Sequence, residues 1–252
     1  MSTPAPPTGR RLAAEYADAM LALLQTCARA EQASVAAAAR LVATTLERDG
    51  LVYVFGSGHS HMFAEEAFYR AGGLARICPI LKPPYMLHES AVESTRLERE
   101  PGHAADVLAG YRLEGGRDCL IVVSNSGANA LPVEVATSAR DRGLPVVAIT
   151  SVAYARSVQR PGTRLHEVAD VVVDNHCPPG DALVAVAPDL PSMGPGSTVA
   201  GLFLLNSILL AAAEEQLAAG STPEIYLSSN MPGAAERNTA LSARLRQAIP
   251  HL

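Results

Sequence analysis

Two short segments combine serine hydroxyls and glycines in a way that suits the binding of a phosphate group. They read GSGHS at 56–60 and SNSGAN at 124–129, and each follows an apolar run, over 51–55 and 118–123. Each also precedes a stretch of helical character, and the unpaired amides at a helix N-terminus attract anions. Serine hydroxyls add donors, and glycine lets the backbone approach a ligand closely. The pair of loops predicts one small phosphorylated ligand between them.

Each loop also has an alternative interpretation. The second loop lacks lysine, which excludes a Walker-type P-loop, and its serines could serve only as caps of the following helix. In the first loop Gly56 and Gly58 match the start of the dinucleotide-binding pattern G-x-G-x-x-G. Position 61 is histidine, however, and residues 78–80 offer no acid for a ribose, so the sequence disfavours a dinucleotide.

Glutamate and histidine residues near the loops could move protons. Glu65 and Glu66 follow the first loop by about one helical turn, and only one of them should face the site because adjacent helical positions point in different directions. By its position we prefer Glu66. His88 and Glu89 follow the next predicted strand, at the edge of a parallel sheet where ligands bind. We predict Glu66, Glu89 and His88 as catalytic residues, the two carboxylates dividing the roles of base and acid. Each could instead be a solvated surface residue, as we expect for Glu93.

Histidines beside the first loop raise the question of a metal ion. His59 and His61 could bind zinc together with His176 or Cys177. No complete ligand set is visible in the sequence, so we predict no metal and no other cofactor. Activity should then survive chelation.

Apolar runs alternate with helical stretches along most of the chain, which predicts a parallel sheet covered on both faces. The predicted fold class is α/β, a Rossmann-like parallel sheet flanked by helices, preceded by a long N-terminal helix or a broken pair over 11–48. Polar and Pro/Gly-rich composition predicts irregular structure over 81–100 and 175–196. Strands are predicted over 51–55, 75–80, 118–123, 145–150 and 171–173.

Composition narrows the class of protein. The 252 residues have a formal net charge of −5, and Lys and Arg are scattered, so no nucleic-acid partner is predicted. The four cysteines form no C-x-x-C pair, which is typical of a reducing compartment. The N-terminus lacks the pattern of a signal peptide, and the longest apolar run, 199–213, is shorter than the ~20 residues that span a bilayer. We therefore predict a cytoplasmic protein without a membrane partner.

The two loops, in this order, resemble the SIS (sugar isomerase) domain family, whose pattern is a strand, G-x-G-x-S, a helix, and later a strand followed by S-x-S-G-x-[TN]. The resemblance covers roughly residues 30–220. It implies a sugar phosphate as ligand and two groups of binding residues. The phosphate would be held by Ser60, Ser124, Asn125, Ser126 and Asn129, and the sugar contacted by Ser57, His59 and Ser197.

The residues GST at 196–198 lead into a helix that looks like the corresponding helix of N-acetylmuramic acid 6-phosphate etherases, one branch of this family. The resemblance therefore implies a lyase on an N-acetylhexosamine 6-phosphate, such as N-acetylglucosamine 6-phosphate, by C2 deprotonation and elimination at C3. In phosphoheptose isomerases an active-site histidine lies at a distance from the loop similar to that of Glu66, so an aldose–ketose isomerase is the alternative. A non-catalytic sugar-phosphate sensor is the third possibility. Such regulators usually carry a DNA-binding domain, and residues 1–50 are too acidic and alanine-rich to supply one.

The same resemblance implies a homodimer or homotetramer, since the long N-terminal helix and the apolar 199–213 helix would suit a subunit interface. The predicted organisation has four parts. They are a disordered N-terminus over 1–10, an N-terminal helical segment over 11–50, a SIS sugar-phosphate-binding core over 51–220, and a tail over 221–252 that packs on the core or on a neighbouring subunit.

Overall fold

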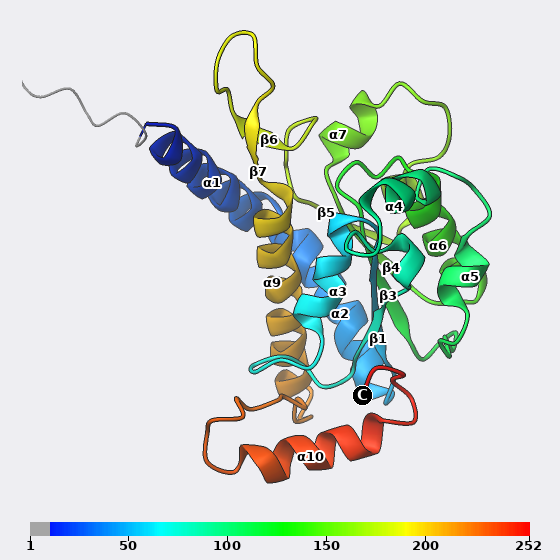
Figure 1. Ribbon diagram of the computed structural model, residues 1–252. Coiled ribbons are helices and arrows are strands. Elements are labelled where there is room, and N and C mark those ends of the chain that lie inside the picture. The colour runs from blue at the N-terminus through cyan, green and yellow to red at the C-terminus, as the bar shows by residue number, and fades with distance from the viewer. Residues whose placement is uncertain (1–10) are drawn as a thin grey trace, which may run out of the picture.

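A five-stranded parallel sheet forms the centre of the protein, as the computed structural model shows (Figure 1). The structure describes residues 11–252, so the disorder predicted for 1–10 lies outside the described residues. The strand order β2-β1-β3-β4-β5 and the helices on both faces confirm the predicted α/β class. The strands are β1 (Val52–Gly56), β2 (Ile77–Ile80), β3 (Cys119–Val123), β4 (Val146–Thr150) and β5 (Val171–Asp174).

Alternate side chains of each central strand enter two different hydrophobic cores. In β1, Val52 and Val54 face one core, whereas Tyr53 and Phe55 face the other, and all four are buried. Burial on both faces explains why these strands read as continuous apolar runs. Helices α1 (Arg11–Ala30), α2 (Gln32–Glu47), α3 (Met62–Ala67) and α9 (Ser197–Ala218) cover the first face. Helices α4 (Ala91–Leu97), α5 (Ala104–Leu108), α6 (Ala130–Asp141), α8 (Leu165–Val168) and α10 (Ala234–Leu245) contribute to the second core.

The N-terminal segment is a broken pair of helices, one of the two forms predicted. The chain changes direction at Glu31, which separates α1 from α2 and has backbone angles φ −97° and ψ 13°. Its buried carboxylate accepts hydrogen bonds from the backbone N–H of Asp174, at 3.1 Å, and pairs with the imidazole of His176, at 2.9 Å. The break thus joins the helix pair to the end of β5.

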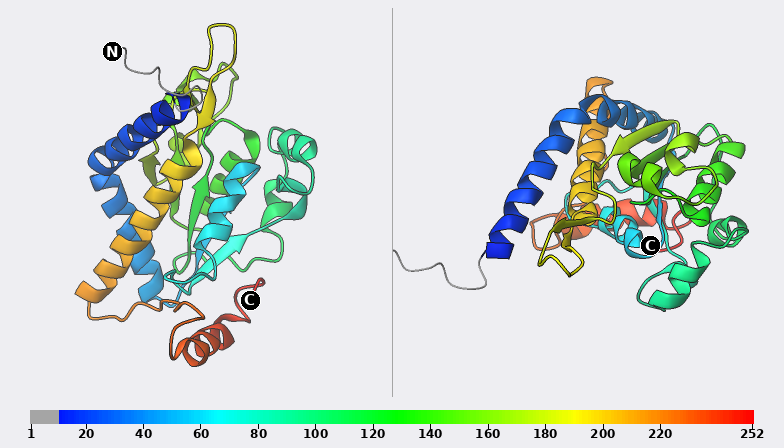
Figure 2. Two further views of the ribbon diagram at one scale, coloured as in Figure 1. Left: turned by 60° about the vertical axis from the view of Figure 1, so that its left-hand side comes forward. Right: turned by 90° about the horizontal axis from the view of Figure 1, so that it is seen from above.

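Helix α9 is long and apolar enough, by length and composition, to cross a membrane. In this structure one face of it belongs to the core, because Ala200, Leu204 and Ile208 are buried against α2 and the sheet. Gly201 permits the close approach of α3, since a Cβ at this position would lie 2.5 Å from the ring of Phe63. Figure 2 shows α9 lying alongside α2 in both views.

Two segments predicted to be irregular contain regular structure. Residues 81–100 include α4, whose N-terminus is capped by Ser90: its hydroxyl accepts a hydrogen bond from the backbone N–H of Glu93, at 3.3 Å. Residues 175–196 include the antiparallel hairpin β6 (Ala182–Val184) and β7 (Met193–Pro195). A short helix α7 (Val152–Ser157) also follows β4, where none was predicted.

The C-terminal tail packs on the core at the amino ends of the strands. Its backbone pairs with the segment before β2, through the amides of Ala75 and Tyr226, and α10 adds Leu241 and Leu245 to the second core. In Figure 1 the tail lies at the bottom of the sheet, opposite the loops that follow the strands. Its Tyr226 and Arg237 are therefore remote from the serine loops of the same chain.

Candidate functional site

A cavity of about 480 Å³ opens at the carboxyl ends of β1 and β3, between the two serine loops. This volume is within the range of pockets that enclose small ligands. Sequence reasoning placed both loops at one site, and the structure brings them together. The predicted residues that line the cavity are Ser57, His59, Ser60, Ser124, Asn125, Ser126 and Asn129.

The second loop is held to β4 by its backbone. The amide of Ser124 donates to the carbonyl of Ile149, and the carbonyl of Asn125 accepts from the amide of Ser151, both near 3 Å. Gly127 has φ +55°, and a Cβ there would lie 2.6 Å from the hydroxyl oxygen of Thr150. Only glycine meets both requirements, so the tight turn is built into the sequence.

The first loop is a short 3-10 turn, His59–His61, between β1 and α3. A Cβ on Gly56 would lie 2.2 Å from the carbonyl oxygen of Ser60, so glycine is required for the loop to fold back on the strand. Gly58 has φ +54° and donates its amide to the carbonyl of Tyr85, at 3.1 Å. This bond ties the first loop to the segment after β2.

A carboxylate that sequence reasoning missed lies at the junction of the two loops. Glu98, just after α4, accepts a hydrogen bond from the hydroxyl of Ser57 at 2.9 Å and another from the amide of Asn129 at 2.7 Å. Burial raises the pKa of Glu98, although the hydrogen bond from Ser57 opposes this shift. A raised pKa brings a carboxylate closer to the range in which a general base or acid works best. The S-x-x-E pattern at 90–93 was the signal that would have predicted α4 and drawn attention to Glu98.

Two arginines that sequence reasoning also missed line the cavity. Arg160 donates a hydrogen bond to the side-chain oxygen of Asn129 at 2.7 Å, and Arg99 lies beside Glu98 in the chain. Both guanidinium groups are exposed, so they add positive charge at the mouth of the cavity. A phosphate group is the kind of ligand that such a donor set suits.

The remaining predicted residues do not line the cavity. Glu66 forms an ion pair with Arg70 on α3. His88 and Glu89 are exposed, 3.7 Å apart at their nearest ionisable atoms, and directly follow Leu87, which does line the cavity. Ser197 begins α9, outside the lining.

Ser197 is nevertheless one contact away from the cavity. Its hydroxyl donates to a carboxylate oxygen of Asp181, at 2.7 Å, and its amide donates to the other, at 2.8 Å. Asp181 belongs to the cavity wall. The start of α9 therefore orients a wall residue.

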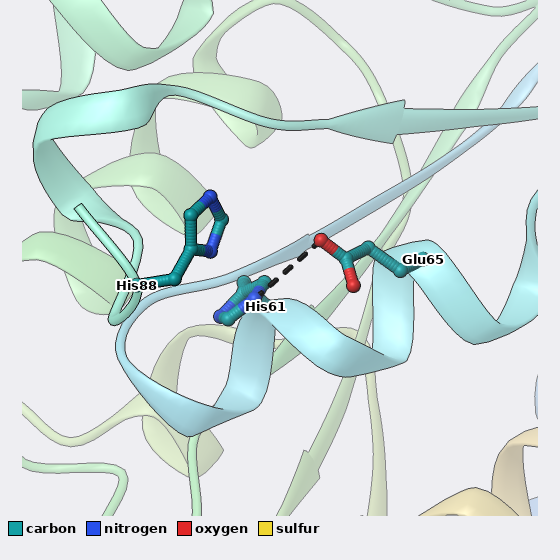
Figure 3. A group of neighbouring side chains, drawn as sticks. All are labelled: His61, Glu65 and His88. Carbon is teal, nitrogen blue, oxygen red and sulfur yellow. Dashed lines mark ion pairs between the residues drawn. The ribbon is translucent and has the colours of Figure 1, made fainter.

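The histidines group differently from the zinc set considered in the sequence. In the part of the chain that the structure describes, three residues place possible metal-ligand atoms within 4.8 Å of one another: His61, Glu65 and His88. Figure 3 shows His61 between the other two side chains. His176 instead pairs with Glu31.

Comparison with known proteins agrees with this architecture. The SIS domain model matches residues 15–151. The chain belongs to the SIS domain family. It is also 46% identical over 215 residues to UPF0309 proteins of Brucella canis and Brucella melitensis biotype 2, an alignment that covers 85% of this chain and 88% of each relative.

Solved structures with a similar fold include two phosphoheptose isomerases. The enzyme from Neisseria gonorrhoeae superposes with a TM-score of 0.54 at 18% identity, covering 81% of this chain and 98% of that chain. The enzyme from Francisella tularensis gives 0.55 at 15% identity, with 82% and 99% covered. At these identities the likeness concerns the fold of the SIS domain.

Proposed function

We propose that this SIS-domain protein is a cytoplasmic lyase that acts on an N-acetylhexosamine 6-phosphate, with N-acetylglucosamine 6-phosphate as the first substrate to test. The observation on which the proposal depends is the half-buried carboxyl group of Glu98, joined by hydrogen bonds to Ser57 and Asn129 in a cavity with two serine loops. The cavity thus combines donors for a phosphate with a group that can move a proton.

Phosphate binding is assigned to the Ser60 side of the first loop and to the second loop. Hydroxyls of Ser60, Ser124 and Ser126, together with the amides that precede α6, supply donors without a lysine. Asn125 and Asn129 complete the second loop, and Ser57 and His59 are proposed to contact the sugar.

The reaction begins at C2 of the open-chain aldehyde. Glu98 takes the C2 proton, whose acidity comes from the neighbouring carbonyl group, and an enolate forms. The enolate then re-forms the carbonyl as a C2–C3 double bond develops, the C3–O bond breaks, and a proton donor converts the leaving oxygen to water. The net change is the loss of one water molecule.

Glu89 is proposed as that proton donor, with His88 beside it. Both are exposed and directly follow Leu87 of the cavity wall, so a side-chain rotation could bring a carboxyl group toward the ligand. Glu66 is the alternative C2 base, and using it would require its ion pair with Arg70 to open. Ser197 acts through Asp181 in this scheme.

Mass spectrometry of the incubated sugar phosphate tests the proposal. Loss of one water from N-acetylglucosamine 6-phosphate supports the lyase, and solvent deuterium at C2 of recovered substrate locates the first step. A new isomer of unchanged mass would replace the lyase with an aldose–ketose isomerase. Tight binding of the sugar phosphate without loss of water or isomerisation would favour the sensor. If the unphosphorylated sugar bound equally well, the serine loops would not be the phosphate site.

A further inference from the structure

We propose that His61, Glu65 and His88 form a binding site for one divalent transition-metal ion of the zinc class. Their ligand atoms all lie within 4.8 Å of one another, and the three side chains come from two segments of the chain (Figure 3). Two imidazoles and one carboxylate form a donor set typical of zinc sites that keep a fourth position for water or a ligand. The inference does not depend on the proposed reaction.

His61 is already oriented as a metal ligand. It is only 6% exposed, and its Nδ1 atom lies 2.5 Å from the carbonyl oxygen of Gly58. A carbonyl oxygen accepts hydrogen bonds, so Nδ1 bears the proton and Nε2 keeps its lone pair. Metal-binding histidines characteristically donate their second ring nitrogen to a carbonyl or carboxylate in this way, which fixes the ring and the tautomer.

Glu65 lies on the same side of the helical segment as His61, because the two positions are four residues apart. Its Oε1 atom is 3.5 Å from His61 Nε2. In a tetrahedral site each ligand atom lies about 2.0–2.2 Å from zinc, so one ion between the two atoms is compatible with this separation. The carboxylate is exposed and free to adjust its rotamer.

His88 reaches the same place from the segment after β2. The amide of Gly58 donates to the carbonyl of Tyr85 at 3.1 Å, and Gly58 and Met86 form a β-bridge. These contacts bring the His88 ring centroid to 5.4 Å from that of His61. The His88 side chain is 57% exposed, so it has room to change its rotamer toward the other two ligands.

A metal at this position would join two walls of the cavity. His61 directly follows Ser60 and His88 directly follows Leu87, and both preceding residues line the cavity. The ion would hold the first serine loop against the segment after β2. This assignment departs from the sequence-based expectation of no metal and replaces the His59-x-His61 set with a different one.

Metal titration of the full chain, without any sugar, tests the site. The protein is stripped with a chelator, dialysed and titrated with Co²⁺ while its visible d–d absorption is followed, and Zn²⁺ is then added in competition. We expect one ion per chain, displaced by Zn²⁺. Glu65→Gln and His88→Ala should each weaken Co²⁺ binding by at least about tenfold, the scale at which even residues that only support ligands act.

The matched controls are Glu66→Gln and His59→Ala, which make similar chemical changes one or two residues from the proposed ligands. Both should keep the wild-type affinity for Co²⁺. Glu65 and His88 are exposed, so their variants should fold, as circular dichroism can verify. Absence of Co²⁺ binding by the wild type, or equal binding by all variants, would overturn the proposal. If His59→Ala lost Co²⁺ binding and His88→Ala kept it, the proposed site would be replaced by the His59-x-His61 site.

Because no sugar is present, this experiment is independent of the lyase assay. A chain that binds the ion but dehydrates no sugar would keep the metal site and lose the proposed function. A chain that dehydrates the sugar phosphate but binds no ion would support the proposed function and exclude the metal site.

Discussion

At the scale of single residues, Glu98 has the surroundings expected of a proton-transfer group. Two neutral donors hold its carboxylate in place, the hydroxyl of Ser57 and the amide of Asn129, and burial raises its pKa. Glu93, on α4 itself, is a nearby acidic residue with the opposite shift: it lies at the surface and pairs with Arg96, whose hydrogen bond lowers the pKa of Glu93. The contrast between these two glutamates, five positions apart, provides a matched pair of variants.

Glu98→Gln should lower turnover by roughly 10²–10⁴-fold, the usual effect of removing a general base. Exchange of the C2 proton with solvent deuterium should fall with it. Because the base must be ionised and burial raises its pKa, wild-type turnover should decline as the pH falls through that raised pKa, at a higher pH than for an ordinary glutamate. The same substitution at Glu93 should leave turnover unchanged, and equal loss in both variants would contradict the assignment.

Glu89→Gln separates the second proton transfer from the first. If Glu89 protonates the leaving oxygen at C3, the variant should bind the sugar phosphate normally and exchange the C2 proton, while forming product roughly 10²–10⁴-fold more slowly. Product and exchange are measured in the same sample by mass spectrometry. Full product formation would remove Glu89 from the mechanism and direct attention to Glu66.

Ser126→Ala should weaken binding of the phosphorylated sugar. A hydrogen bond to a charged group contributes about 1.5–3 kcal/mol, so the affinity should fall roughly 10- to 100-fold. Calorimetry in a Glu98→Gln background prevents turnover during the titration. Ser207→Ala, on the exposed side of α9, is the control and should bind normally. An unchanged affinity for Ser126→Ala would exclude the second loop as the phosphate site.

At the scale of elements, the second serine loop works because β3, β4 and α6 hold it in one conformation. Its backbone is bonded to β4, and its turn depends on the left-handed conformation of Gly127. The loop therefore needs little reorganisation when a phosphate binds. The same contacts make it sensitive to a single methyl group.

Gly127→Ala should both destabilise the protein and weaken phosphate binding. A left-handed residue other than glycine costs about 1–2 kcal/mol, and the added Cβ also meets the Thr150 hydroxyl 2.6 Å away. Gly116→Ala isolates the first effect, because Gly116 has φ +75° with open space around it. Thermal unfolding should show the larger loss of stability for Gly127→Ala. Equal losses would mean that the contact with Thr150 relaxes freely.

At the scale of the whole molecule, α9 leaves one apolar face without a partner in the described chain. Val199, Phe203, Leu210 and Leu217 recur at helical spacing and are exposed, Leu210 at 71%. An exposed apolar stripe of this kind is typical of a subunit interface. The homodimer or homotetramer expected from the sequence stays a prediction, and this stripe is where we expect its subunits to meet.

Leu210→Lys should therefore shift the protein toward a smaller assembly, because a charge would have to be buried in the interface. Size-exclusion chromatography with light scattering measures the mass directly. Val92→Lys makes the same change at an exposed residue of α4, on the other side of the sheet, and should leave the mass unchanged. A wild-type protein that is monomeric at all concentrations would contradict the predicted interface.

The sequence alone determined the fold class and the location of the two loops. Burial on both faces of a parallel sheet produces continuous apolar runs, and the required glycines at 56 and 127 mark the loops that follow β1 and β3. These are local signals, because each depends on residues close together in the chain. Helix α4 within 81–100 and the hairpin within 175–196 were missed because the polar and Pro/Gly-rich composition of these segments obscured the local pattern.

Only the tertiary structure decided which charged groups meet. Glu98 reaches Ser57, 41 positions away, and Asn129, 31 positions away, because α4 packs beside the carboxyl ends of the strands. His88 joins His61 because a bridge at Gly58 holds two segments together. Charged side chains have no periodic signal of their own, and their partners are set by the packing of apolar surfaces that bring distant segments side by side.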